Sequence, residues 1–238
     1  MLMIRRALCA LLSTLSVLIP TVAPNHINAW ASFKESDGVY ARVSTDEKVI
    51  ALTFDDGPHP YLTDKILRIL ESYGVRATFF VVGSMARAYP SVLKRVSLAG
   101  HELGNHTYTH LAESDANIDK LRDEIIKTEQ TVFDLTARKT FLFRPPTGYC
   151  CGSAVKMTGE LGYKTVVWDI DTKDWTHRSP NDILREVKRS ARNGSIILFH
   201  DFIGTDSPTP EALKLVIPYL LGEGYTFVTV GEMIKLYS

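Results

Sequence analysis

The feature that most limits the fold of this chain is the regular alternation of short apolar runs with longer amphipathic stretches. Most of the runs are rich in β-branched or aromatic residues and too short for helices, which predicts strands. The seven runs are Val49–Phe54, Ala77–Val82, His101–Gly104, Phe141–Arg144, Thr165–Trp168, Ile196–Phe199 and Phe227–Val230. Strands that alternate with helices pair in parallel, so the sequence predicts an α/β fold, either layered or closed as a barrel.

The stretches between the runs have the apolar spacing of helices. In Ile118–Leu135 and in Ile66–Tyr73, which a glycine follows, the apolar residues recur on one helix face. Ser179–Pro180 is typical of a helix start, with a capping serine and a proline in the first turn. The apolar stretch Leu213–Leu221 contains Pro218, which we expect to kink that helix.

The chain is long enough for one domain with a sizeable core. Its 238 residues are 45% hydrophobic, a composition that excludes disordered and collagen-like proteins. No Pro/Gly/Ser-rich linker, charge block or repeat interrupts residues 34–238, so we expect a single domain over residues 32–238. The 27 basic residues balance 27 acidic ones, which argues against a protein that grips nucleic-acid phosphates.

Residues 1–31 have the pattern of a cleaved secretory signal. Arg5 and Arg6 precede the apolar run Ala7–Ile19, and Ala29–Ala31 has the small-x-small form of a cleavage site. The apolar run is shorter than the ~20 residues of a spanning helix, so an uncleaved anchor is the second interpretation. Either way we expect export of the domain, which is then secreted, periplasmic or attached to the cell envelope. Cleavage removes two basic residues and no acidic ones, which leaves a net charge of −2.

Two polar motifs that follow predicted strands offer the ligands of a metal site. Asp55 and Asp56 follow the first run, and His106 and His110 follow the third. Each motif alone is often structural, but histidines four residues apart meet on one side of a helical turn and share one cation. One aspartate with two histidines forms a facial set that suits zinc or another divalent first-row metal. Asp55 is then the spare carboxylate, available to take a proton from water.

Three later motifs add candidates, because chemistry in such folds gathers where strands end. After Arg144, two prolines stiffen the chain and lack an N–H, so Thr147 has the first backbone donor for an oxyanion hole; the alternative is simply a rigid loop. Arg144 would hold a carboxylate ionised. His200 beside a carboxylate is a natural general acid. Trp175 is equally plausible as a core residue and as a wall on which a sugar stacks.

Taken together and in this order, five stretches resemble the NodB-like polysaccharide deacetylases, carbohydrate esterase family 4. The stretches, within a similarity that spans about residues 48–230, are Thr53-Phe54-Asp55-Asp56, His106-Thr107-Tyr108-Thr109-His110, Arg144-Pro145-Pro146, Asp171-Thr172-Lys173-Asp174-Trp175 and Leu198-Phe199-His200. Each motif is weak alone, whereas five in sequence are specific. The resemblance implies a single distorted (β/α) barrel of about seven parallel strands, in agreement with the seven predicted runs.

The resemblance also implies a role for each motif residue. Asp55 would be the catalytic base, and one divalent metal, zinc in the first place, would be held by Asp56, His106 and His110. Arg144 would tether Asp55, and the Thr147 N–H would be the oxyanion donor. Asp174 would orient His200 as the general acid. Trp175 would form a groove wall, and Leu198 would line the pocket for the acetyl methyl group.

The implied reaction is hydrolysis of the acetamide of N-acetylglucosamine units in a polysaccharide, with release of acetate. Peptidoglycan or a chitin-like polymer is the leading substrate class, because an exported enzyme meets such polymers. We expect a monomer whose partner is the polysaccharide, with no nucleic acid, and with a membrane only if the leader is uncleaved. The alternatives are an O-acetyl esterase on acetylxylan-type glycans and a non-catalytic glycan- or metal-binding relative, which the presence of Asp55 and His200 disfavours.

Thr147 departs from the family pattern, in which this position is commonly tyrosine. A backbone donor survives the change, so the oxyanion role stays possible, but an aromatic ring that would shape the substrate site is lost. Of the cysteines, Cys9 leaves with the leader, and a disulfide between the adjacent Cys150 and Cys151 would close a strained ring. We expect the latter two to be buried thiols; the alternative in an exported protein is an oxidised or intermolecular form.

Overall fold

The protein is built on a single sheet in which every strand pairs in parallel. The computed structural model describes residues 34–111, 117–149, 151–204 and 206–238. The predicted leader, Cys9 and Cys150 lie outside these described residues. The strands follow the order β1-β6-β5-β4-β3-β2-β8-β7, and β9 pairs with the start of β2. The nine described strands are β1 (Val39–Tyr40), β2 (Val49–Asp55), β3 (Thr78–Val81), β4 (Glu102–Asn105), β5 (Leu142–Phe143), β6 (Lys164–Val166), β7 (Ile170–Asp171), β8 (Ser195–His200) and β9 (Thr226–Phe227).

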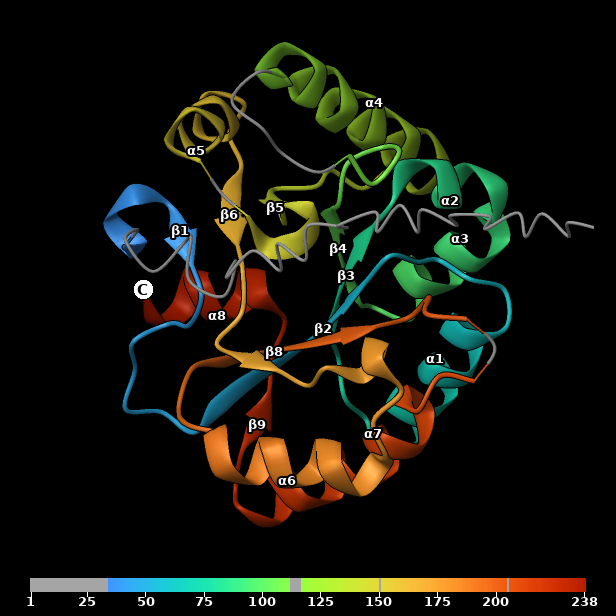
Figure 1. Cartoon of the computed structure of the whole chain (residues 1–238), viewed down its shortest axis with the longest axis vertical. Coiled ribbons are helices and arrows are strands. Elements are labelled where there is room, and N and C mark those ends of the chain that lie inside the picture. Colours follow the sequence, from blue (N-terminus) through green and yellow to red (C-terminus); the bar gives the residue numbers. More distant parts are fainter. Residues whose placement is uncertain (1–33, 112–116, 150, 205) are drawn as a thin grey trace, which may run out of the picture.

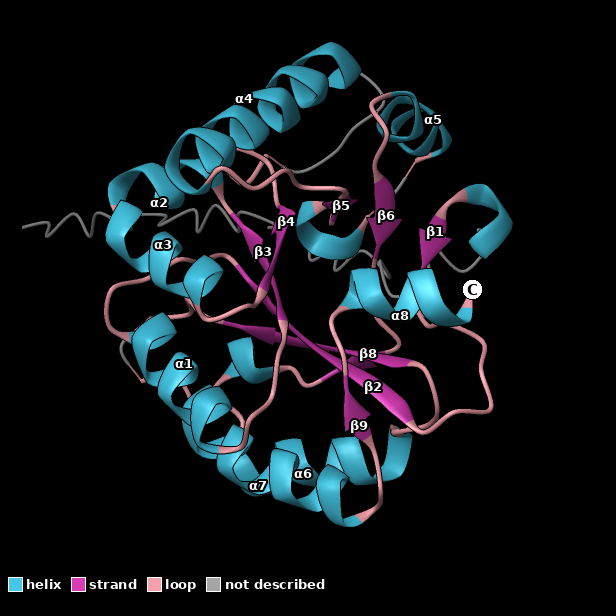
Figure 2. Ribbon diagram, turned by 180° about the vertical axis from the view of Figure 1, so that it is seen from behind, coloured by secondary structure: helices cyan, strands magenta, loops and turns pink. Residues whose placement is uncertain are grey.

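The α/β fold with parallel strands is confirmed, and six of the seven predicted runs contain a strand over half or more of their length. The seventh run, Phe227–Val230, is wrong beyond Phe227, because β9 ends there and Val230 already begins a helix. The sequence does not predict β1 and β7, because each has two residues that lie outside the predicted apolar runs. Within the described residues the ladder of hydrogen-bonded strands ends at β1 and β7 rather than joining them. The barrel is therefore distorted and open along one side. Figure 2 shows β2 and β8 crossing at its centre.

Most helices surround the sheet on its outer side, whereas the last helix, Val230–Tyr237, packs against inward-facing residues such as Ala51 and Ile196 (Figure 1). The predicted capping serine is confirmed, because Ser179 Oγ accepts a hydrogen bond from Asp182 N at 3.2 Å at the start of its helix. Pro218 lies inside the continuous helix Thr209–Gly222, and a kink at this position stays a prediction. No described helix is long and apolar enough to cross a membrane. The helices are α1 (Leu62–Ser72), α2 (Gly83–Ala88), α3 (Pro90–Leu98), α4 (Ile118–Thr136), α5 (Gly152–Glu160), α6 (Pro180–Ser190), α7 (Thr209–Gly222) and α8 (Val230–Tyr237), with short 3-10 turns at Glu35–Asp37, Pro146–Gly148 and Asp174–Thr176.

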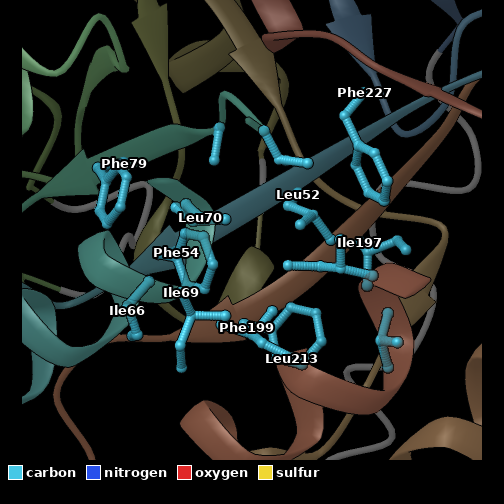
Figure 3. Close-up of a cluster of buried hydrophobic side chains, with 14 of the residues drawn as sticks. Leu52, Phe54, Ile66, Ile69, Leu70, Phe79, Ile197, Phe199, Leu213 and Phe227 are labelled. Atoms are coloured by element: carbon cyan, nitrogen blue, oxygen red, sulfur yellow. The ribbon is translucent and has the colours of Figure 1, made fainter. Parts of the chain in front are cut away.

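The largest part of the core lies between the central strands and helices α1 and α7. Leu52 and Phe54 of β2, with Ile197 and Phe199 of β8, pack among the buried side chains of these helices (Figure 3). Since successive residues of a strand point to opposite faces, the residues between them face the interior of the barrel. The same alternation that builds the core therefore directs polar side chains of β2 and β8, Thr53, Asp55 and His200, toward the inside.

Candidate active site

The predicted site residues meet at the carboxyl ends of neighbouring strands. Asp55 and His200 are the last residues of β2 and β8, and the register of these strands pairs them with each other. His106 directly follows β4, and Arg144 directly follows β5. Parallel strands end at the same edge of a sheet, which is where α/β barrels assemble their active sites. Motifs far apart in the sequence thus form one site.

Asp56, His106 and His110 form a cluster whose ligand atoms fit a metal ion. One oxygen and two nitrogens of these side chains lie within 4.8 Å of one another. The Nε2 atoms of His106 and His110 are 3.5 and 3.1 Å from Asp56 Oδ1, a buried oxygen without a hydrogen bond of good geometry among the described residues. Two imidazoles and one carboxylate are a donor set for zinc and related divalent metals, with positions left for water and substrate.

The electrostatics of this cluster keep Asp56 ionised. Burial alone raises the pKa of Asp56, but the imidazoles of His106 and His110 outweigh it and hold the pKa well below its ordinary value. The same interaction with Asp56 raises the pKa of His110. The carboxylate is therefore available as an anionic ligand.

The route by which the two histidines converge differs from the prediction. The helical turn expected over His106–His110 is wrong, because this segment is an irregular loop between β4 and the residues that precede α4. Thr107 and His110 have positive φ angles of 63° and 57°, which a helix excludes. Left-handed backbone at these two positions turns the loop back on itself, and this turn brings the second histidine to the first.

The His106 ring is oriented by a backbone acceptor on the other side. Its Nδ1 lies 2.7 Å from the carbonyl oxygen of Arg144. Because a carbonyl oxygen only accepts, Nδ1 carries a proton, and Nε2 faces the Asp56 cluster, an arrangement typical of metal-bound histidine. His106 is buried, whereas the His110 side chain is 42% exposed, so the cluster opens to solvent on the His110 side.

A fully buried ion pair stands beside the cluster. Arg144 Nη1 donates to Asp55 Oδ1 at 2.8 Å and to Thr53 Oγ1 at 2.8 Å. The remaining guanidinium nitrogens donate to the carbonyl oxygens of Val166 and Val167. Arg144 is 0% exposed and every nitrogen has an acceptor, which is the condition under which a buried charge is tolerated. Asp55 Oδ2 stays free of this pair and lies 3.8 Å from His106 Nε2.

On the other side of Asp55, His200 forms a pair with Asp174. His200 Nδ1 lies 2.7 Å from Asp174 Oδ1, and the His200 N–H donates to Asp174 Oδ2 at 2.8 Å. Burial alone lowers the pKa of His200, but Asp174, helped by the charges of Asp55 and Asp56, raises that pKa to about 9. The imidazole is therefore protonated at neutral pH.

The three remaining predicted residues follow or precede these groups closely in the chain. Thr147 is exposed in the 3-10 turn Pro146–Gly148 and has a positive φ of 67°, an uncommon conformation for a β-branched residue. Trp175 is 53% exposed, so it is not a core residue. Leu198 is buried on β8, two residues before His200.

The sequence of the chain matches a known protein family over much of this region. The family model described as polysaccharide deacetylase matches residues 42–166, more than half of the chain. This chain belongs to the polysaccharide deacetylase family. It is 39% identical over 195 residues to a peptidoglycan-N-acetylglucosamine deacetylase of Bacillus cereus, a match that covers 81% of this chain and 91% of the relative.

Solved structures of two family relatives agree with the fold of this polysaccharide deacetylase. One is a peptidoglycan N-acetylglucosamine deacetylase in complex with an N-hydroxybenzamide, with a TM-score of 0.81, 36% identity, and coverage of 84% of this chain and 94% of that chain. The other is a family 4 acetyl xylan esterase from Clostridium thermocellum in complex with a cobalt ion, with a TM-score of 0.73, 33% identity, and coverage of 79% and 91%.

The structure adds residues for which the sequence motifs indicate no role. Thr53 Oγ1 accepts from Arg144 and donates to Ile197 O at 2.7 Å, and its place inside the first motif is a signal that could have found it. Thr209 Oγ1 donates to Asp174 Oδ2 at 2.6 Å from 35 residues away. No pattern in the sequence indicates that contact.

Asp201 supports the turn that carries the two motif aspartates. Its N–H donates to Asp55 O at 3.0 Å, and its Oδ2 accepts from Thr63 Oγ1 at 2.5 Å. Burial raises the pKa of Asp201 to about 7. A Cβ at Gly57 would lie 2.1 Å from Asp201 Oδ2, so the close approach of this carboxyl requires glycine at position 57.

Proposed function

We propose that this polysaccharide deacetylase removes the acetyl group from N-acetylglucosamine units of peptidoglycan or a chitin-like polymer. The observation that carries the proposal is the meeting, at one edge of the sheet, of the Asp56–His106–His110 set, the Asp55–Arg144 pair and the His200–Asp174 pair. These groups supply metal ligands, a carboxylate base and a protonated acid for amide hydrolysis.

Asp56, His106 and His110 would hold one divalent cation, with zinc the first choice for two nitrogens and one oxygen. Such a cation, when bound, supplies Lewis-acid activation of water and polarisation of the acetyl carbonyl. Asp55 then takes the proton of the attacking water, with its second oxygen fixed by Arg144 at 2.8 Å. The arginine bond directs the free oxygen toward the cluster.

Two further groups would complete the reaction. The Thr147 N–H stabilises the negative charge that develops on the carbonyl oxygen, because a preset backbone donor needs no rearrangement at that moment. His200 gives its proton to the leaving amine, and Asp174 holds the imidazole in place. Leu198 lines the pocket for the acetyl methyl group, and the exposed Trp175 offers its ring to a sugar face.

The substrate class is supported by the relatives and by the predicted export of the chain. The Bacillus cereus relative is named for peptidoglycan N-acetylglucosamine, and it is similar over 91% of its length. Export by residues 1–31 would bring the enzyme to cell-wall polymers. The specific observation behind a second candidate, an O-acetyl esterase, is the similarity to an acetyl xylan esterase. Asp55 and His200 are both present, which favours turnover over a binding-only relative.

The test is acetate release by the purified protein from peptidoglycan, chitin oligomers and acetylated xylan. We expect release from an N-acetyl glycan, its loss on treatment with a chelator, and its return when zinc is added. Release from acetylated xylan alone would instead support the second candidate, an O-acetyl esterase. Release that a chelator leaves unchanged would contradict the proposed metal dependence.

A pH profile tests His200 as the acid. Because the pKa of His200 is raised to about 9, the proton that the leaving amine needs is present at neutral pH and is lost as the pH rises through that value. We expect kcat to fall on this alkaline side. Asp174→Asn removes the charge that raises the pKa, so the alkaline limb should move to lower pH by about one unit or more. An unchanged limb in this variant would contradict the assignment.

A further inference from the structure

We propose that Glu124 of α4 is a positioning residue for the metal site, because its carboxylate holds the loop that carries both histidine ligands. The inference rests on the proposed ligand set Asp56, His106 and His110. Glu124 belongs to none of the motifs of the sequence analysis, and it precedes Ile125, whose side chain is in the core. Its carboxylate projects from the helix toward the loop that follows β4.

One oxygen of Glu124 accepts hydrogen bonds from residues in the middle of this loop. Glu124 Oε2 accepts from Tyr108 N at 2.8 Å, Thr109 N at 2.6 Å and Thr109 Oγ1 at 3.0 Å. Tyr108 and Thr109 lie between the two histidines, so this contact spans the part of the loop that sets their separation. Hydrogen bonds from N–H groups to an ionised carboxylate are about twice as strong as those between neutral groups.

The opposite edge of the same loop is held by α2. Gly83 N donates to Thr107 O at 3.0 Å, and Ser84 N donates to Tyr108 O at 2.9 Å. The loop therefore presents its carbonyl groups to the start of α2 and its N–H groups to Glu124. A Cβ at Gly83 would lie 2.5 Å from the Tyr108 ring, which shows how closely α2 approaches the loop.

The hydrogen bonds on both sides stabilise the loop, whose backbone conformation is unfavourable by itself. Thr107 and His110 have positive φ, and residues in sparsely populated backbone regions cost about 1–3 kcal/mol each unless their surroundings hold them. Without the charge of the Glu124 carboxylate, two loop N–H groups lose a charge-assisted hydrogen bond, and the left-handed turn loses part of its support on the α4 side. His110, at the exposed end of the loop, would then leave the position from which its Nε2 meets Asp56.

The test is a zinc titration of the full protein by competition with a chelating dye. Glu124→Gln keeps the size of the side chain, removes its charge and puts an NH₂ group in place of one oxygen. We expect the Kd for zinc to rise by about 10–100-fold, the range for residues that orient metal ligands. Asp123→Asn, the same kind of change at the exposed neighbouring position of α4, serves as the matched control and should leave the Kd unchanged.

The unfolding free energy of the metal-free variants separates positioning from a merely structural role. A Glu124→Gln protein that is less stable but binds zinc with wild-type affinity would overturn the inference. If Glu124→Gln does not fold, Glu124→Asp and Thr109→Val are used; a wild-type Kd in both would also overturn it. Asp56→Asn tests the ligand set separately. If it binds zinc as tightly as the wild type, the proposed function fails rather than the role of Glu124 alone.

Discussion

Replacing Asp55 by asparagine is expected to lower kcat by about 10²–10⁴-fold, the usual contribution of a positioned acid or base. The amide has nearly the same shape and still accepts the hydrogen bond that Arg144 donates at 2.8 Å. Its other end, however, no longer takes a proton from water. Because Asp56, His106 and His110 are untouched, zinc binding should persist. Acetate release and a zinc titration on the same sample measure both properties.

The interpretation of the Asp55→Asn variant depends on its folded state. Asp55 is buried beside a guanidinium, so the variant leaves a cation without its counter-charge, and circular dichroism must show native structure at the assay temperature. Asp123→Asn again provides a matched control, with wild-type kcat expected. Full activity in a folded Asp55→Asn protein would show that another group is the base.

Replacing Arg144 by methionine is expected to destabilise the protein by about 3–5 kcal/mol, the cost of removing one partner of a buried ion pair. The Asp55 carboxylate would be left buried without a counter-charge. The guanidinium carbon lies 4.1 and 5.6 Å from the ring centres of Phe80 and Trp168, so the apolar methionine side chain would have aromatic neighbours. Urea unfolding in the presence of a chelator measures the loss of stability without a contribution from bound metal.

An exposed arginine supplies the matched comparison. Arg95 makes two hydrogen bonds to Asp64, at 2.9 and 2.8 Å, with nearly half of its side chain in solvent. Arg95→Met should cost about 0–1 kcal/mol, as for surface ion pairs. The double variant Arg144→Met with Asp55→Asn should lose less stability than the sum of the two single changes, because it removes both charges. Additive losses would contradict an ion pair that acts as a unit.

The sequence predicts the framework of this protein because its longer strands and helices carry local patterns. Run Val49–Phe54 is fully buried as β2, and Ser179 caps α6 as expected. Such elements depend on neighbouring residues, so a single sequence is enough to identify them. Strands β1 and β7 have two residues each and lie outside the predicted runs, and they are defined by their pairing with β6 and β8.

The sequence likewise predicts only a part of the candidate site. The identity of its motif residues follows from the order of the motifs along the chain, but the means of holding them does not. Spacing predicts that His106 and His110 approach each other, yet the path is a left-handed loop bonded to Glu124, 15 or 16 residues further on. Contacts between residues this far apart in the sequence form only when packing brings α4 to the loop, and no local pattern encodes them.

The register that pairs Asp55 with His200 has a consequence for how the enzyme loses activity. Both side chains stand on adjacent central strands, and breaking the hydrogen bonds between these strands requires opening of the whole core. Their backbone amides should therefore exchange with deuterium among the slowest in the chain. Gentle heating would then first loosen the loop that holds the two histidines, so affinity for metal is lost while the pairing of Asp55 with His200 survives. Inactivation at moderate temperature should accordingly be reversed by excess zinc.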